Sequence, residues 1–308
     1  MLIFLAVLGG CEAKLDLSGV EKSEQQAVKR SDQFLAAAEN DQALVIVGRR
    51  GVVLTSFDRG ESWQRQQLTG DTVVDLPNLV DITACPDGNF IALDTNRKIW
   101  LGGADARTWT SKKIDTPEEV VDLACDATGA YWVVGSFTLI LKSQDQGQSW
   151  QDMSIGEDAL LSRIQFVTPE HAVITGEFGV VYTSEDGGKS WFPTGPVPNE
   201  FYSAASYFRT SQQGWVGGLQ GIILYTEDGG KSWNRQKTGT SSPIYRIFEN
   251  GKSLIALGDQ GTILSLHENE WRPLTVEGLG FGYLRAAVPL EDGQFLVAGG
   301  NGLLRTIH

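Results

Sequence analysis

The sequence is poor in the residues that most often hold metals or assist nucleophiles. It contains three histidines and three cysteines among 308 residues. His171, His267 and His308 are far apart in the chain, in segments expected to be a turn, an outer segment and the C-terminus. They predict neither a metal site nor a histidine-based catalytic relay. We therefore expect no metal and no cofactor.

Basic residues are also scarce. The chain has 25 Lys and Arg against 38 Asp and Glu, a formal net charge of −13. The electrostatic attraction that drives binding to nucleic acid or to anionic lipid has the wrong sign here, so we expect no nucleic-acid partner. The apolar stretch from Met1 to Leu8 is too short to span a bilayer. A lipid anchor is then the only membrane attachment that we expect.

Glycine is abundant, with 36 residues, and much of it lies in a repeated turn. The quartet 48–51 (Gly-Arg-Arg-Gly) recurs at steps of 46, 41, 41, 42, 40 and 41 residues. Seven copies at that period predict an all-β fold, a seven-bladed β-propeller of four-stranded antiparallel blades over residues 31–308. The other quartets are 94–97, 135–138, 176–179, 218–221, 258–261 and 299–302.

Each repeat is expected to contain four short strands. In the fourth repeat these are 163–166, 172–176, 179–183 and the segment after Trp191. The seventh repeat stops at 303–308, after its third strand. A segment near 15–17 could supply the missing outer strand from the N-terminal side and close the ring, which would cover an exposed sheet edge.

The most specific motif follows the third strand and has the pattern Ser/Thr-x-Asp-x-Gly-x-Ser/Thr-Trp, the Asp-box. The carboxylate can accept backbone N–H groups of its own turn, the Gly permits an unusual backbone angle, and the Trp packs between blades. Degenerate copies keep Trp109 and Trp271 but lose the Asp. We expect an architectural role for Asp58, Trp63, Asp145, Trp150, Asp186, Trp191, Asp228 and Trp233.

Two other interpretations of the box are weaker. A calcium loop needs six or more oxygen ligands, whereas each box offers one dependable carboxylate. The segments 188–190 and 230–232 (Gly-Lys-Ser) imitate the end of a phosphate-binding P-loop. The glycine that a P-loop requires five residues earlier is Thr183 in one copy and Tyr225 in the other.

The N-terminus resembles a bacterial lipoprotein signal. Residues 8–11 (Leu-Gly-Gly-Cys) resemble a lipobox, in which Cys11 would be diacylated; 1–11 would be the signal and 12–30 a polar tether. The first four residues lack Lys and Arg, a departure that leaves open a leftover apolar leader or a buried first strand. Glu12 resembles the residue of lipoproteins sent to the outer membrane. The expected location is its periplasmic face, or the thylakoid lumen in a photosynthetic host.

Cys85 and Cys125 lie at the same stage of neighbouring repeats but one residue out of register, four after Asp81 and three after Asp122. If the strands are otherwise aligned, the two side chains point to opposite faces of the pleat, where disulfide geometry is hard to reach. We expect two buried thiols, with a disulfide between them as the alternative.

Seven Asp-box repeats of about 41 residues, strand patterns such as 214–217 (Gly-Trp-Val-Gly) and the lipobox resemble the photosystem II stability/assembly factor family of seven-bladed propellers, also called BNR repeats. The resemblance covers nearly the whole chain. It implies a non-enzymatic scaffold outside the cytoplasm that binds a protein subunit and assists assembly of a membrane complex. It also implies an arginine patch.

Arginines recur near the starts of inner strands. Arg163, Arg246 and Arg285 lie 13, 12 and 14 residues before their quartets, and Asp81 and Asp122 take the equivalent sites of the second and third repeats. All five can surround one end of the channel, where the arginines either neutralise the aspartates or bind a partner. The expected partner-binding patch is Arg49, Arg50, Arg97, Phe137, Arg163, Phe178, Arg246 and Arg285.

Two alternatives remain. A sialidase, which carries the same box, needs three arginines, a Tyr/Glu pair and an Asp in one pocket. Here the Arg-Ile-Pro sequence of sialidases is missing, and Tyr245 is the only tyrosine next to these arginines. The chain could still bind glycans, or it could be an accessory lipoprotein of an envelope exporter. In each case we expect a monomer.

Overall fold

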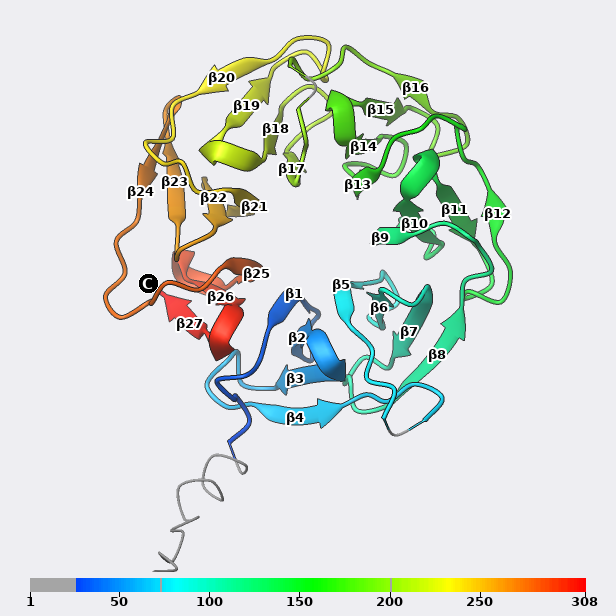
Figure 1. The fold of residues 1–308 in the computed structure, drawn as a ribbon, viewed down its shortest axis with the longest axis vertical. Helices are drawn as coiled ribbons and strands as arrows, with labels where there is room; N and C mark the ends of the chain where they lie inside the picture. The colour runs from blue at the N-terminus through cyan, green and yellow to red at the C-terminus, as the bar shows by residue number, and fades with distance from the viewer. Residues whose placement is uncertain (1–25, 73, 200) are drawn as a thin grey trace, which may run out of the picture.

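The chain forms a ring of antiparallel sheets around a central axis, which we call the channel (Figure 1). The computed structural model describes residues 26–72, 74–199 and 201–308. Six sheets have four strands and one has three. The predicted all-β seven-bladed propeller is confirmed. The signal 1–11 with Cys11, and the segment near 15–17, lie outside the described residues.

Each blade runs from an inner strand at the channel to an outer strand at the rim, in chain order (Figure 1). Blade 1 comprises β1 (Phe34–Glu39), β2 (Leu44–Gly48), β3 (Val52–Ser56) and β4 (Gln64–Gln67); blade 2 comprises β5 (Leu79–Ala84), β6 (Phe90–Asp94), β7 (Lys98–Gly102) and β8 (Trp109–Lys113); blade 3 comprises β9 (Val120–Cys125), β10 (Tyr131–Gly135), β11 (Ile140–Ser143) and β12 (Gln151–Asp152).

The remaining blades continue the same order around the ring. Blade 4 comprises β13 (Leu161–Phe166), β14 (Ala172–Gly176), β15 (Val181–Ser184) and β16 (Phe192–Pro193); blade 5 comprises β17 (Ala205–Phe208), β18 (Gly214–Gly217), β19 (Ile223–Thr226) and β20 (Asn234–Gln236); blade 6 comprises β21 (Ile244–Asn250), β22 (Ser253–Gly258), β23 (Ile263–His267) and β24 (Glu270–Pro273); blade 7 comprises β25 (Leu284–Pro289), β26 (Phe295–Gly299) and β27 (Leu304–Ile307).

The quartets join the second and third strands of their blades. In five blades they form short 3-10 turns whose third residue has left-handed backbone angles, as at Arg50 (φ 59°). At the fourth position, a Cβ on Gly51 would lie 2.1 Å from the Leu68 carbonyl oxygen, so no side chain fits there. These turns are η1 (Arg49–Gly51), η2 (Ser136–Thr138), η3 (Glu177–Gly179), η4 (Leu219–Gly221) and η6 (Gly300–Gly302); η5 (Glu291–Gly293) joins β25 to β26.

The apolar core is divided among the interfaces between neighbouring blades. Seven apolar clusters are present in the described part of the chain, and each contains residues of two adjacent blades. In the cluster between blades 7 and 1, for example, Phe34 and Leu54 pack with Leu296 and Ala298. Because no blade buries both faces alone, the blades stabilise one another around the ring.

The N-terminal side of the described chain lies against blade 7. The Gly302 amide donates to the Asp32 carbonyl at 2.9 Å. A Cβ on Gly302 would lie 2.2 Å from the Lys29 carbonyl, the same relation that Gly51 has to Leu68 after the outer strand of blade 1. In blade 7, Lys29 therefore takes the position that Leu68 has after the outer strand of blade 1. Arg65 fixes this segment through two hydrogen bonds to the Asp32 carboxylate, at 2.8 and 3.0 Å.

The expectation of two free thiols is wrong, because Cys85 and Cys125 form a disulfide with a Cα–Cα distance of 5.3 Å. Cys125 is the last residue of β9, but Cys85 lies one residue beyond β5. The Cys85 amide donates to the Asn89 carbonyl and so begins the following turn. The alternation of side chains along a strand does not apply there, and the bond joins blades 2 and 3.

No helix in the described ranges is both long and apolar enough to cross a membrane.

Candidate functional site

Seven residues at matching positions of the inner strands surround the channel. Each pairs with the residue just before the first quartet position of its own blade; Asp81 pairs with Leu93 and Arg163 with Thr175, for example. The inner strands lie closest to the axis in Figure 1. We call these seven residues the channel ring. In blade order they are Ala36, Asp81, Asp122, Arg163, Ala205, Arg246 and Ala286.

Arg163 is neutralised within this ring. Its Nη1 lies 2.6 Å from Asp122 Oδ1 and 3.9 Å from Asp81 Oδ1. Both carboxylates are buried, and the Arg163 side chain is 25% exposed. The predicted charge neutralisation across the channel therefore holds for this arginine, and its guanidinium is engaged.

The two aspartates also connect neighbouring blades. Asp81 Oδ2 accepts the Leu123 amide at 3.2 Å, and Asp122 Oδ2 accepts the Ile164 amide at 2.8 Å. Burial raises the pKa of Asp122 well above its usual range, and the Arg163 charge acts in the opposite direction. The two carboxylates and Arg163 therefore form a buried charge cluster that joins blades 2, 3 and 4.

Arg246 lies in the same ring but forms no ion pair with any described carboxylate. Its Nε is buried and has no hydrogen-bond partner. Burial lowers the pKa of the guanidinium to about 10, and the Arg163 charge acts in the same direction. The ring neighbours of Arg246 are Ala205 and Ala286, whose short side chains leave the guanidinium without a polar partner. A charged, incompletely paired guanidinium is a binding site for an anion.

Arg285 lies at the same end of the propeller but is not one of the seven residues of the channel ring. The pairing of β25 with β26 shifts between Leu284 and Ala286, so Arg285 is the bulged residue and Ala286 takes the ring position. Its side chain is exposed, unlike those of the ring residues. The face that carries the quartets, which we call the quartet face, therefore has a free cation beside the channel mouth.

The other predicted patch residues lie on quartets of the same face. Arg49 and Arg50 of blade 1 are exposed. Arg97 of blade 2 is half-buried, and its Nη1 donates to the Pro117 carbonyl at 2.7 Å. Phe137 and Phe178 of blades 3 and 4 are 55% and 56% exposed, so they project from the surface as expected for apolar anchors.

Sequence reasoning noted Tyr245 but missed two further tyrosines that the Arg285 charge reaches, Tyr202 and Tyr283. Burial raises the pKa of all three tyrosines, and the charge of Arg285 acts in the opposite direction. Tyr245 is in β21, whereas Tyr202 and Tyr283 come from the segments that enter blades 5 and 7. The repeat pattern gave no signal for these two because the entry segments differ in length and sequence.

Each Asp-box is closed by hydrogen bonds within its own turn. Asp186 Oδ1 accepts the Ser190 amide at 2.9 Å, and Ser184 Oγ donates to Asp186 Oδ1 and accepts the Gly188 amide, both at 2.8 Å. The hydrogen bonds to the carboxylate lower the pKa of Asp186 to about 2, led by the one that the Ser190 hydroxyl donates. Hydrogen bonds of the same kind, led by the hydroxyl of the box serine, lower the pKa to about 2 at Asp58, Asp145 and Asp228.

The box tryptophans pack between blades but are only partly buried. Trp191 lies edge-on to Trp132 of the preceding blade, with ring centroids 6.1 Å apart. Trp132 itself is fully buried, and its Nε1 donates to Asp126 at 2.9 Å. The indoles that the boxes supply are therefore less deeply buried than Trp132. The other box tryptophans, Trp63, Trp150 and Trp233, also lie in clusters that join adjacent blades.

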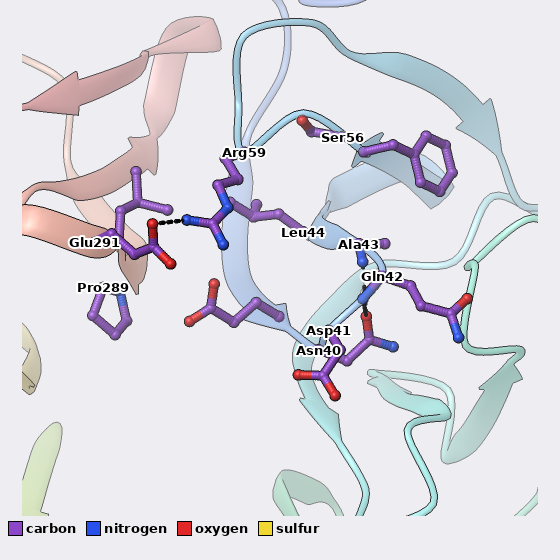
Figure 2. A pocket seen from close by; sticks show the side chains of 12 residues that line it. Asn40, Asp41, Gln42, Ala43, Leu44, Ser56, Arg59, Pro289 and Glu291 are labelled. Carbon is purple, nitrogen blue, oxygen red and sulfur yellow. Dashed lines mark hydrogen bonds and ion pairs between the residues drawn. The ribbon is translucent and has the colours of Figure 1, made fainter.

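A hollow of about 580 Å³ lies on the opposite face, between blades 7 and 1 (Figure 2). An ion pair between Arg59 and Glu291 crosses it, and the Asn40 side chain accepts the Gln42 and Ala43 amides at its edge. Both partners of the ion pair are highly exposed, so the hollow is open to solvent and its charges are screened. Its residues do not form a constellation for acid–base or nucleophilic catalysis.

In the described part of the chain, the quartet face likewise lacks the arrangement that sialidase chemistry requires. Arg163 is held by Asp122 and Asp81, and Arg285 lies outside the ring that contains Arg246. Three arginines are therefore not free to hold one carboxylate. The arrangement is suited to binding, with anion-attracting groups beside exposed apolar side chains.

Comparisons with known proteins agree with the repeat assignment. A family model described as "Photosynthesis system II assembly factor YCF48" matches residues 101–198. The photosystem II assembly lipoprotein Ycf48 of Synechococcus sp. (strain CC9605) is 30% identical over 146 residues, 45% of this chain and 42% of that protein. The photosystem II assembly protein Ycf48 of Thermosynechococcus vestitus is 25% identical over 198 residues, 60% of this chain and 54% of that protein. The chain thus spans about half the length of these curated relatives.

Solved structures share the fold at low identity. YCF48 from Cyanidioschyzon merolae superposes with a TM-score of 0.63 at 16% identity, covering 77% of this chain and 83% of that one. A structure titled "YCF48 bound to D1 peptide" gives 0.72 at 14% identity, covering 91% and 93%. A virginiamycin B lyase from Staphylococcus aureus gives 0.67 at 11% identity, covering 90% and 95%, so the propeller fold alone does not indicate a function.

Proposed function

We propose that this seven-bladed propeller, which is similar to the Ycf48 photosystem II assembly proteins, binds a protein subunit of a membrane complex through its quartet face and assists the assembly of that complex. The observation that carries the proposal is the incompletely paired guanidinium of Arg246 beside exposed Arg285. The partner would present a carboxylate to these two cations. Ycf48 bound to a D1 peptide is a precedent in a protein of the same fold.

The proposed role is non-catalytic. It rests on binding groups that are free and on the engagement of Arg163, which removes one of the arginines a sialidase would need. Turnover of a fluorogenic sialoside by the purified protein would contradict this part of the proposal. A screen on a glycan array would test the alternative of glycan binding.

We also propose a lipid anchor at Cys11 and a site of action outside the cytoplasm. Two of the relatives are named lipoproteins, and the chain carries the lipobox-like residues 8–11. The membrane would be the outer membrane, on its periplasmic side, or the thylakoid membrane facing the lumen in a photosynthetic host. Labelling with a radioactive fatty acid, lost in Cys11→Ser, would test the anchor.

The test of partner binding is the double variant Arg246→Gln, Arg285→Gln. We expect it to lose pull-down of the partner from solubilised membranes of the source organism, with a melting temperature close to that of the wild type, because neither arginine forms an ion pair in the described structure. Arg59→Gln, an arginine on the opposite face, is the matched control. Unchanged pull-down by the double variant would reject the site.

A further inference from the structure

At the quartets and the starts of the inner strands, the free charges and the apolar protrusions lie on different blades. Within the predicted partner-binding patch, the arginines without a carboxylate partner among the described residues are Arg49, Arg50, Arg97, Arg246 and Arg285, on blades 1, 2, 6 and 7, which are consecutive around the ring. Blade 4 carries Arg163, whose charge is engaged by Asp122. We call blades 6, 7, 1 and 2 the cationic half of the face.

The other three blades each present a large apolar side chain at the quartet. Leu219 of blade 5 is 56% exposed, as is Phe178 of blade 4, and Phe137 of blade 3 is 55% exposed. We call these three residues the apolar tips. Outside the quartets, Val74 and Phe281 lie in the segments that enter blades 2 and 7, are 84% and 91% exposed, and so add apolar contacts beside the cations.

The turns themselves do not require apolar residues. Phe137 and Phe178 have left-handed backbone angles, φ 53° and 55°, which bulky side chains rarely adopt. Asn301 occupies the same position in blade 7 with φ 59°, and Asn suits that backbone better. The phenylalanines are therefore held in an unfavourable conformation that also points them away from the core, as expected for side chains that contact a partner.

A tyrosine of the quartet face lies within the electrostatic reach of charges from both halves. Burial raises the pKa of Tyr202, the Glu177 charge raises it further, and Arg285 lowers it. Tyr202 lies in the segment from β16 to β17 and is 38% exposed, so its ring is available as an aromatic contact surface.

We infer that the quartet face receives one extended segment of the partner in a fixed direction, with carboxylates over blades 6, 7, 1 and 2 and aliphatic or aromatic side chains against the apolar tips of blades 3, 4 and 5. The inference rests on the proposed function and adds the chemistry and the direction of the bound segment. The acidic end would bind the cationic half through charge complementarity, and the apolar end would bury its side chains against the apolar tips. A segment bound in the reverse direction would lose both interactions.

The test uses synthetic peptides of about 12 residues, which extend to roughly 40 Å. One peptide has Asp and Glu at one end and Leu and Phe at the other, and carries a photo-crosslinker at either the acidic or the apolar end. The control peptide has the same residues interleaved. Crosslinked sites on the intact propeller are mapped by mass spectrometry, and affinities are measured by fluorescence anisotropy.

We expect the acidic-end probe to label segments around residues 49–51 and 299–302, and the apolar-end probe to label those around 136–138 and 219–221. The triple variant Phe137→Ser, Phe178→Ser, Leu219→Ser should weaken block-peptide binding by about tenfold or more. Phe192→Ser removes an equally exposed phenylalanine from the outer strand β16 and is the matched control.

Labelling of both halves by each probe, or equal affinity for the interleaved peptide, would overturn the inference. So would an absence of labelling by either block peptide. The proposed function is judged separately, by pull-down of the native partner with the Arg246 and Arg285 variants. A native partner that is lost in those variants but unaffected by the triple variant would leave the function standing and refute the division of the face.

Discussion

At the scale of single residues, the surroundings of a charged side chain decide whether it stabilises the fold or is free to bind. Arg163 and Arg246 occupy equivalent positions of blades 4 and 6. Arg163 lies beside two buried carboxylates, whereas the nearest ring neighbours of Arg246 are alanines. The same residue type at the same position therefore has a structural role in one blade and a proposed binding role in the other.

Substitution of these arginines should separate the two roles. Arg163→Met is expected to lower the free energy of unfolding by about 3 kcal/mol, because it leaves the Asp122 carboxylate buried without its cation. Arg246→Met should change it by less than about 1 kcal/mol, since no ion pair is lost. Urea denaturation of the two variants measures both values. Equal losses would show that Arg246 is as structural as Arg163.

The Asp-box carboxylates make stability depend on acid pH. The pKa of Asp186 is lowered in the folded state to about 2, from an ordinary value of 3.8. A depressed folded-state pKa contributes stability that is present above the unfolded pKa, so this contribution is lost as the pH falls from about 4 to about 2. Melting temperatures of the wild type should fall over this range, and Asp186→Asn should fall less steeply. Parallel profiles would contradict the assignment.

Asp122 acts in the opposite sense. Its raised folded-state pKa means that the folded protein holds a proton that the unfolded chain has already lost, so this group lowers stability as the pH rises above the ordinary value of 3.8. In Asp122→Asn this fall of stability with rising pH should disappear. Comparison of the Asp186→Asn and Asp122→Asn pH profiles, from the same set of thermal melts, distinguishes the contribution of the surface turns from that of the buried ring.

At the scale of elements, the disulfide joins the ends of two neighbouring inner strands. Cys85 and Cys125 are 40 residues apart and enclose the outer three strands of blade 2 and the inner strand of blade 3. The double variant Cys85→Ser, Cys125→Ser should lower the free energy of unfolding by about 2–4 kcal/mol, because the reduced unfolded chain has more freedom. Denaturation of the wild type with and without a reductant provides the comparison. An unchanged midpoint in both would show that the bond does not constrain the unfolded chain.

Tryptophans of the strands should matter more than those of the boxes. Trp132 is fully buried in the cluster between blades 3 and 4, so Trp132→Ala is expected to cost about 3–5 kcal/mol. Trp191 packs at the border of the same cluster and is partly exposed, so Trp191→Ala should cost less. Calorimetry of both variants, with Trp191→Phe as the milder substitution, tests the order. The reverse order would mean that the box indole carries more of the interface than its burial indicates.

The repeat made the blades predictable, whereas single-residue offsets limited the prediction of the site. Quartets and Asp-boxes recur with the chain period, so seven blades and the box hydrogen bonds followed from spacing. A bulge recurs at the start of the inner strand in six blades and has no signature in residue types, so the sequence did not show that Arg285 is the bulged residue and that Ala286 is in the ring. The turn that begins at Cys85 placed one cysteine beyond its strand, and Tyr202 and Tyr283 lie in segments outside the strands.

At the scale of the whole molecule, the closure between blades 7 and 1 depends on residues from opposite ends of the chain. Phe34 and Leu296 belong to one apolar cluster, and Gly302 donates to Asp32. A chain stopped before residue 284 lacks β25 to β27 and so cannot form this interface. We expect such a chain to be digested rapidly by protease, whereas the full chain resists. Equal resistance would show that six blades are stable without closure.

That closure bears on when the protein can fold during synthesis. A ribosome adds about 260 residues between Phe34 and its partner Leu296, which takes roughly 13 to 50 s at ordinary elongation rates. For that time the first blade has an apolar side without its native neighbour. A chain exported through a membrane while unfolded would benefit from such a delay, because a ring completed only after the last blade emerges cannot obstruct the translocation pore.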